Sequence, residues 1–286
     1  MRAESDKRTV YKTDCSDSIS LKKAYKEGKE ILAKAGITEA DLDAWYLLEF
    51  VTGITKARYY MDPDQSMDPE AWKKYKEYLE KRRNHIPLQH ITGSQEFMGL
   101  EFLVNEHVLI PRQDTEVLVE EALEMMKQET FRSKDCLQLL DMCTGSGCIL
   151  LSVMHYAEQK GIFIEGTGVD FSEQVLMVAQ KNEKHLRSTK KDENGKVNWI
   201  LSDLFENVSE TYDMILSNPP YIRTAEIEKL QDEVKLHDPF SALDGKEDGL
   251  YFYRKIVTDA KQFLKTGGIL AVSYTHLRAH ETAANL

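Results

Sequence analysis

Residues 139–148 read LLDMCTGSGC, and this stretch decides the fold of the 286-residue chain. An apolar run ends in an acid, a glycine-containing turn follows, and residues 148–159 continue as an apolar helical segment. Glycines at 145 and 147 permit positive φ angles and let a ligand approach the backbone closely. In doubly wound sheets a nucleotide binds at such a strand–turn–helix junction, although the same pattern also suits a turn that binds nothing.

Outward from this stretch, apolar strands alternate with helical segments. The pattern predicts strands at 136–141, 162–170, 197–201, 212–217 and 268–273, and helices at 115–128, 148–159, 172–186 and 249–264. Such alternation is typical of crossover units, which build a parallel sheet covered on both faces. We therefore expect an α/β, Rossmann-like domain over residues 111–273.

The part before residue 111 has a different character. Residues 1–18 are polar and without periodicity, which indicates a disordered leader. Residues 19–86 show helical periodicity that predicts three or four short amphipathic helices in a small bundle. Pro87 breaks the last helix. Short β-like runs at 91–93, 96–99 and 101–104 then predict a β-hairpin linker over residues 87–110.

Composition excludes several classes of protein. With 37 basic and 48 acidic residues the net charge is -11, which argues against a surface built mainly for nucleic-acid phosphates but leaves a local basic groove open. No apolar run approaches the ~20 residues of a membrane span, and the charged N-terminus is not a signal peptide. The four cysteines form no CxxC pair, so we expect a cytoplasmic protein without a disulfide framework or a metal site.

The glycine turn points to one kind of cofactor. Leu150 stands where a GxGxxG dinucleotide fingerprint requires its third glycine, so that fingerprint is absent. The segment instead resembles the acid-x-Gly-x-Gly-x-Gly loop of S-adenosylmethionine (SAM) methyltransferases, with a cysteine in place of the first glycine. This resemblance implies that SAM is bound by Cys143, Thr144, Gly145, Ser146 and Gly147.

Two further strand ends carry acids that suit the same cofactor. Asp170 lies 23 residues after Gly147, where a carboxylate can accept hydrogen bonds from both ribose hydroxyls, and a helix N-cap role is compatible with that reading. Asp203 and Leu204 follow the strand 197–201. In this fold their position can offer a carboxylate to the adenine amine and apolar atoms to its ring, although a polar strand end is the default interpretation.

The sharpest motif is Asn218-Pro219-Pro220-Tyr221, directly after the strand 212–217. Two prolines stiffen the backbone and remove two donors, which leaves the carbonyl of Pro219 as a fixed acceptor. The side-chain oxygen of Asn218 is a second acceptor, and Tyr221 supplies a flat ring. This arrangement suits a planar NH₂ group of adenine, cytosine or a glutamine side chain, and a purely structural turn is the alternative.

A methyl transfer follows from this chemistry. An amide nitrogen is a poor nucleophile because its lone pair is delocalised into the carbonyl. Hydrogen bonds from its two N–H groups to two acceptors raise the electron density on the nitrogen and direct it at the methyl group. The sulfonium methyl is already activated, so one in-line displacement suffices without metal or covalent intermediate. Positioning and electrostatics then supply the rate enhancement, and the proton can leave after the transfer, so no general base is expected.

Between about residues 21 and 272 the sequence resembles the release-factor glutamine methyltransferase family (the PrmC/HemK type). Besides the Asn-Pro-Pro-Tyr motif, the resemblance rests on PLQHITG at 87–93, EFMGL at 96–100, IPRQDTE at 110–116 and DPFSALDG at 238–245. It implies a helical N-terminal domain, a hairpin linker and a SAM-binding domain. It also implies the substrate, the glutamine of the Gly-Gly-Gln motif in class 1 peptide chain release factors, held by residues 218–221. Asn218 is expected to contact SAM as well.

Several interpretations stay open at this point. The same four-residue motif occurs in adenine methyltransferases that act on DNA or RNA, and a catalytically silent nucleotide-binding protein is a third reading. Arg112 could position the SAM carboxylate or the substrate backbone, or form an ion pair that fixes the linker. The role of Glu116 is equally undecided.

The last thirteen residues, 274–286, match nothing expected of the family. We interpret them as an atypical tail joined to a sheet that lacks its usual later strands. The strand 268–273 would then be an exposed apolar edge, and such edges invite pairing with other chains. We therefore expect lower solubility and activity than in a chain with a family-like C-terminus.

Overall fold

The computed structural model describes residues 19–187 and 195–273. The predicted leader and tail lie outside these residues. Contacts divide the chain into two units, Met1–Ile91 and Thr92–Leu286, which are considered separately. The division falls inside the predicted linker, and the predicted domain bounds stay a prediction.

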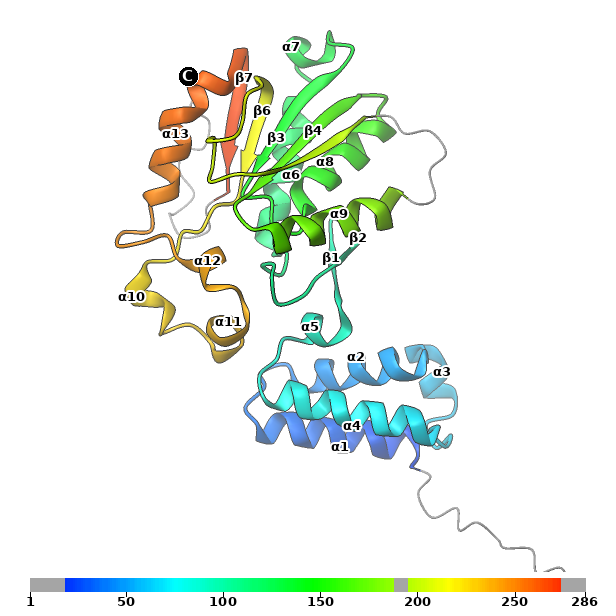
Figure 1. The fold of residues 1–286 in the computed structure, drawn as a ribbon. Helices are drawn as coiled ribbons and strands as arrows, with labels where there is room; N and C mark the ends of the chain where they lie inside the picture. The colour runs from blue at the N-terminus through cyan, green and yellow to red at the C-terminus, as the bar shows by residue number, and fades with distance from the viewer. Residues whose placement is uncertain (1–18, 188–194, 274–286) are drawn as a thin grey trace, which may run out of the picture. The chain divides into compact units, whose positions relative to one another are not determined.

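Among its described residues before Pro87, the first unit holds four helices, α1 (Leu21–Lys34), α2 (Ala40–Thr52), α3 (Lys56–Met61) and α4 (Pro69–Arg83) (Figure 1). Local sequence sets their ends: the Asp68 carboxylate accepts from the first amides of α4, and Gly53 ends α2 in the left-handed conformation. In the core, the Tyr75 hydroxyl donates to the carbonyl of Ala44 over 3.0 Å. The predicted bundle is confirmed, with four helices.

The expected strand at 91–93 is wrong, because these residues end a helix and enter a turn. Helix α5 covers Leu88–Thr92, and the carbonyl of Pro87 accepts from the amides of His90 and Ile91. A proline ends a preceding helix but its fixed φ suits the start of the next one. The hairpin itself is confirmed with shifted bounds, β1 (Ser94–Phe97) and β2 (Leu100–Leu103), because Met98 and Gly99 both have positive φ and form the turn.

The second unit contains the expected parallel sheet. Its strands are β3 (Leu137–Met142), β4 (Ile164–Asp170), β5 (Val197–Leu201), β6 (Tyr212–Ser217) and β7 (Leu264–Val272), in the order β5-β4-β3-β6-β7 (Figure 1). The predicted strands are confirmed, but β7 begins four residues earlier than expected. A register shift between Tyr212 and Met214 accommodates the extra residues of β7 opposite β6.

Helices cover both faces of this sheet, as the alternation predicts. Leu139 and Leu216 point to a core shared with α6 (Glu116–Met125) and α8 (Cys148–Gln159), whereas Leu140 and Ile215 join Ile256 of α13 (Tyr251–Phe263). Helix α9 (Glu173–Arg187) packs against β4 and β5. Consecutive strand residues face opposite sides, so these strands are apolar throughout.

The pattern missed the short helical elements. They are η1 (Gln113–Thr115), α7 (Glu129–Arg132), α10 (Thr224–Ile227), α11 (Asp232–His237) and α12 (Phe240–Leu243). With three to six residues each, these elements are too short to show a 3.6-residue period. Three of them, α10, α11 and α12, lie between β6 and α13, in the connection that follows the Asn-Pro-Pro-Tyr motif.

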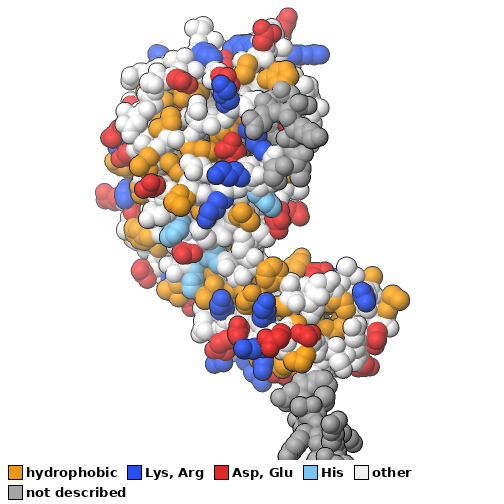
Figure 2. All heavy atoms as spheres, turned by 45° about the vertical axis from the view of Figure 1, so that its right-hand side comes forward, with side chains coloured by type: hydrophobic (Ala, Val, Ile, Leu, Met, Phe, Trp, Pro, Cys, Tyr) orange, Lys and Arg blue, Asp and Glu red, His pale blue; other side chains and the backbone are white. Residues whose placement is uncertain are grey.

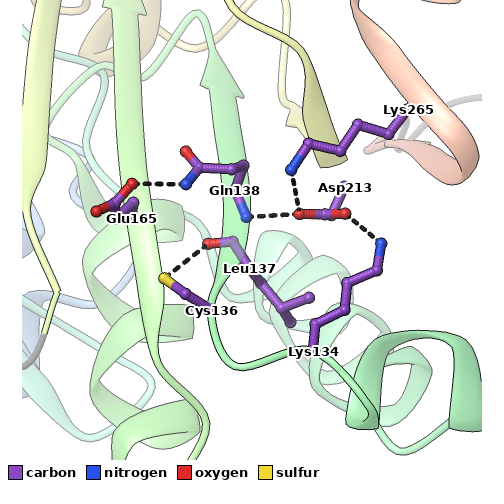
Figure 3. Close-up of polar contacts among 7 residues, drawn as sticks. All are labelled: Lys134, Cys136, Leu137, Gln138, Glu165, Asp213 and Lys265. Carbon is purple, nitrogen blue, oxygen red and sulfur yellow. Dashed lines mark hydrogen bonds and ion pairs between the residues drawn. The ribbon is translucent and has the colours of Figure 1, made fainter.

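A buried carboxylate fixes the amino ends of the central strands (Figure 3). Asp213 accepts from the amide of Gln138 over 2.8 Å and from Lys265 over 2.9 Å, and it pairs with Lys134 as well. Burial alone would raise the pKa of Asp213, but these hydrogen bonds outweigh burial and hold the pKa below its usual value. The ionised group therefore ties β3, β6 and β7 together at the end of the sheet away from the glycine turn.

Among residues 19–187 and 195–273, no helix is long and apolar enough to cross a membrane. No group of His, Cys, Asp or Glu side chains in the same ranges is arranged to hold a metal ion.

Candidate functional site

The carboxyl ends of β3, β4, β5 and β6 surround one cavity of about 930 Å³, a volume that includes space open to solvent. Parallel register brings these ends together, since Asp141 pairs with both Gly168 and Leu216. Nearly all of the predicted cofactor residues line this cavity: Cys143, Thr144, Gly145, Ser146, Asp170, Asp203, Leu204 and Asn218. Gly147 does not line it and serves the turn instead.

The glycine turn needs left-handed backbone at three positions. Cys143, Gly145 and Gly147 have φ angles of 60°, 57° and 79°. A Cβ at Gly147 would lie 3.0 Å from the Trp199 ring, so a side chain there would be crowded by the ring as well as strained by the positive φ. A Cβ at Gly145 would meet nothing within 4 Å, which leaves room for a ligand beside its backbone.

Asp141, at the end of β3, stabilises the glycine turn. It is fully buried, and its Oδ2 accepts from the Thr144 hydroxyl over 2.6 Å. Burial raises the pKa of Asp141 to about 7, although the Thr144 hydrogen bond lowers it. Asp141 does not line the cavity, and its role is to fix the turn rather than to touch a ligand.

Asp170 joins the end of β4 to the glycine turn. Its Oδ2 accepts from the amide of Gly145 over 3.1 Å, and its Oδ1 accepts from the amide of Ser172 over 3.3 Å. Burial raises its pKa to about 6, against the lowering effect of these hydrogen bonds. Each carboxylate oxygen keeps a further lone pair, so the group can accept ligand hydroxyls from the cavity.

Replacing this carboxylate should weaken SAM binding. We expect Asp170→Ala to raise the SAM dissociation constant about tenfold to a hundredfold, because a charge-assisted acceptor is lost. The wild-type affinity should also fall as the pH drops below about 6, since the acceptor is then protonated. Calorimetry across this pH range checks both points, with Asp170→Asn as the control whose affinity should lack that transition. An unchanged affinity in Asp170→Ala would contradict the assignment.

The end of β5 contributes the apolar side of the cavity. Leu204 is buried and has a φ of 48°, and Phe205 beside it stacks on Phe263 at 4.6 Å between ring centroids. Two rings that the sequence analysis did not name, Phe171 and Phe252, also line the cavity. In the sequence, the signal for Phe171 was its position directly after Asp170, at the end of a predicted strand. In the structure its side chain is 60% exposed and lines the cavity.

A second cavity adjoins the first, and residues of the Asn-Pro-Pro-Tyr motif line both. Asn218 lines both cavities, while Pro220 lines the first and Tyr221 the second. Pro219 is buried and lines neither. Asn218 donates its Nδ2 to the hydroxyl of Thr115 over 3.2 Å, a contact across 103 residues that the sequence analysis did not foresee. Asn218 is therefore placed to contact groups in both cavities.

The segment 111–116 connects three parts of the second unit. Arg112 pairs with the buried carboxylate of Asp238 at 2.5 Å, and Glu116 accepts from the amide of Met98 in the hairpin turn over 2.7 Å. Burial raises the pKa of Asp238 to about 6, although Arg112 lowers it. The ion pair that was one reading of Arg112 is present, with a partner in the connection before α12. Arg112 also lines both cavities, so the reading in which it contacts a ligand stays a prediction.

The chain 243–249 packs on the backbone of Tyr221. Ile222 donates to the carbonyl of Leu243 over 2.9 Å, and Gly245 donates to the carbonyl of Ile222 over 2.8 Å. A Cβ at Gly245 would lie 2.7 Å from Tyr221 Cα, and one at Gly249 would lie 2.4 Å from the Tyr221 carbonyl oxygen. These glycines therefore belong to the site, and of the two only Gly245 lies in a stretch singled out from the sequence, without this role.

Comparison with known proteins gives matches in both units. The profile of the PrmC N-terminal domain matches residues 23–93, and that of the methyltransferase small domain matches residues 122–286. A release factor glutamine methyltransferase from Geobacter sulfurreducens is 37% identical over 262 residues, which cover 91% of this chain and 86% of that protein. One from Caulobacter vibrioides is 36% identical over 256 residues, which cover 89% and 84%.

Proposed function

This chain belongs to the release factor glutamine methyltransferase family, and on that basis we propose its reaction and the residues that perform it. It transfers a methyl group from SAM to the side-chain amide nitrogen of the glutamine in the Gly-Gly-Gln motif of class 1 peptide chain release factors. The assignment rests on the position of Asn218, which lines both cavities.

The first cavity fits SAM by the chemistry of its lining. Asp170 offers lone pairs to ribose hydroxyls, and the open space beside Gly145 admits a ligand against the backbone. Leu204, Phe171 and Phe252 supply apolar surface for a base. When bound, SAM supplies a methyl group already activated on a sulfonium sulfur.

The second cavity fits a glutamine side chain. With Nδ2 of Asn218 directed to Thr115, its Oδ1 remains to accept an N–H of the substrate amide. The carbonyl of Pro219 is proposed as the second acceptor because two consecutive prolines fix the backbone there, although Pro219 itself lines neither cavity. Tyr221 lies on the wall of this cavity and offers its ring to the flat amide. These contacts orient the nitrogen lone pair, and the proton departs after the transfer.

The competing adenine methyltransferase reading requires a surface for nucleic-acid phosphates. On the face shown in Figure 2, basic and acidic side chains of the described residues are interspersed rather than gathered by sign. The net charge of -11 points the same way. We therefore favour the protein substrate.

The substrate assignment is tested by changing the target glutamine to glutamate in a release factor. A carboxylate presents no N–H to the two acceptors, so transfer of label from SAM should disappear. The unmodified release factor and duplex DNA serve as parallel substrates. Duplex DNA methylated as fast as the release factor would overturn the protein-substrate assignment, and a chain that labels neither would support the silent nucleotide-binding alternative.

A further inference from the structure

We propose that Asn182 is a positioning residue for SAM, because its buried side-chain amide joins the glycine turn to the β-hairpin from outside the cavity. Asn182 belongs to α9, is fully buried and lines neither cavity. The inference rests on the proposed function only in taking the first cavity as the SAM site. SAM affinity then depends on a residue that does not touch SAM.

The Asn182 amide makes three hydrogen bonds to the backbone of two distant segments. Its Nδ2 donates to the carbonyl of Ser146 over 2.9 Å and to that of Leu103 over 3.0 Å. Its Oδ1 accepts from the amide of Leu103 over 2.6 Å. A backbone N–H only donates and a backbone carbonyl only accepts, so these partners fix which end of the side-chain amide is which.

Leu103, the last residue of β2, needs a hydrogen-bond partner outside the hairpin. It lies opposite Ser94, and the amide of the next residue, Val104, donates to the carbonyl of Gly93 over 3.0 Å. Hydrogen-bonded and non-hydrogen-bonded pairs alternate along an antiparallel ladder, so the N–H and C=O of Leu103 face away from β1. Among the described residues β2 pairs with no other strand, and Asn182 supplies both missing partners.

Ser146 lies in the middle of the glycine turn and lines the first cavity. The glycines on either side of it both have positive φ, and glycine restrains the adjoining peptide planes less than other residues do. Among the described residues the Ser146 carbonyl accepts a hydrogen bond only from Asn182. The Asn182 amide therefore sets the direction of this carbonyl, and with it the backbone surface that the turn presents to SAM.

The hairpin is a firm anchor for this link. Phe97 and Phe102 are buried in the core that the hairpin shares with α6 and α8. At the hairpin turn, the amide of Met98 donates to Glu116, and its carbonyl accepts from the Tyr156 hydroxyl over 2.5 Å. Because the hairpin is fixed in this way, a displacement of the glycine turn has to break the turn's hydrogen bond to α9.

The test is Asn182→Asp, which keeps an acceptor for the Leu103 amide and places an oxygen opposite the two carbonyls. We expect the SAM dissociation constant to rise about tenfold to a hundredfold, because the Ser146 carbonyl loses its donor and is repelled. The kcat for release factor at saturating SAM should stay within about threefold of the wild type, since the residues that hold the glutamine are unchanged. Asn182→Ala replaces this variant if it does not fold.

Tyr156→Phe is the matched control. It also removes a side-chain hydrogen bond to the backbone of the hairpin, but it leaves the glycine turn untouched. Tyr156 lines neither cavity, so its variant should bind SAM as the wild type does. Calorimetric SAM titration, steady-state methyl transfer and thermal unfolding are measured on the wild type and both variants.

A second readout follows the link in the opposite direction. Hydrogen exchange of the Leu103 amide is measured with and without S-adenosylhomocysteine, which occupies the site without reacting. Binding should slow this exchange in the wild type although Leu103 lines neither cavity, because a steadier turn steadies the Asn182 acceptor. In Asn182→Asp the slowing should disappear, since the bond to the turn is gone.

Four outcomes would overturn the role of Asn182. They are an unchanged SAM dissociation constant in Asn182→Asp, an equal rise in Tyr156→Phe, a loss of kcat at saturating SAM as large as the rise in the dissociation constant, and Leu103 exchange that S-adenosylhomocysteine does not slow in the wild type. A wild-type protein that binds SAM but methylates no release factor would instead overturn the proposed substrate, and the SAM affinities would still decide the role of Asn182.

Discussion

Asn218→Ala should lower kcat for release factor methylation on the order of a thousandfold, the size expected when a group that orients and polarises the reacting atom is removed. The substitution removes one of two acceptors for the substrate N–H groups. SAM binding should persist, because Asp170 and the glycine turn, which are assigned to the cofactor, remain in place.

Single-turnover methyl transfer and calorimetric SAM titration on the same preparation check this prediction. Asn198→Ala is a suitable control, since Asn198 is an exposed asparagine in β5 that lines neither cavity. If SAM affinity in Asn218→Ala falls in proportion to activity, Asn218 acts mainly on the cofactor and does not hold the substrate.

Gly245→Ala should lower activity by about a hundredfold or more, because an ångström-scale displacement of a positioning group is enough for such a loss. The new methyl group would lie within 2.9 Å of three backbone atoms, two in Tyr221 and one in Gly249. Backbone cannot move aside as a flexible side chain can, so Tyr221 and the chain 243–249 must separate.

The matched control is Gly36→Ala in the first unit. Gly36 has a φ of 78° and nothing within 4 Å of its would-be Cβ, so this variant strains the backbone without touching the site. Methyl-transfer rates and thermal unfolding of both variants are compared. Full activity in Gly245→Ala would show that the packing against Tyr221 is dispensable for catalysis.

The sheet edge expected at 268–273 is present, since β7 lies at the end of the strand order and pairs only with β6 among the described residues. Figure 1 shows α13 beside it. The carbonyl of Ser217, the last residue of β6, accepts from the amide of Ser273 over 2.8 Å. The residue before Asn218 is thus hydrogen-bonded to this edge of the sheet.

The sequence by itself determined the class of fold, because the patterns that define this class are each contained in a short stretch of chain. Apolar strands, helical periods and the glycine turn each lie within a few residues, and β5, β6 and α8 have the predicted bounds. The strand-end residues assigned to the cofactor could be predicted for the same reason. In a parallel sheet all carboxyl ends meet at one edge, so the positions of the strands in the chain are enough to place Asp170 and Asp203 near the turn.

Only the tertiary structure decided the contacts that orient those residues. Thr115 meets Asn218 across 103 residues and Arg112 meets Asp238 across 126, and no local pattern encodes either pairing. No local pattern encodes the packing of residues 243–249 on the backbone of Tyr221 either. That packing requires glycine at 245 and 249, because a Cβ at either position would collide with the Tyr221 backbone. Hydrophobic periodicity reports which face of an element is buried, whereas the partner of a polar side chain depends on how distant segments fold together.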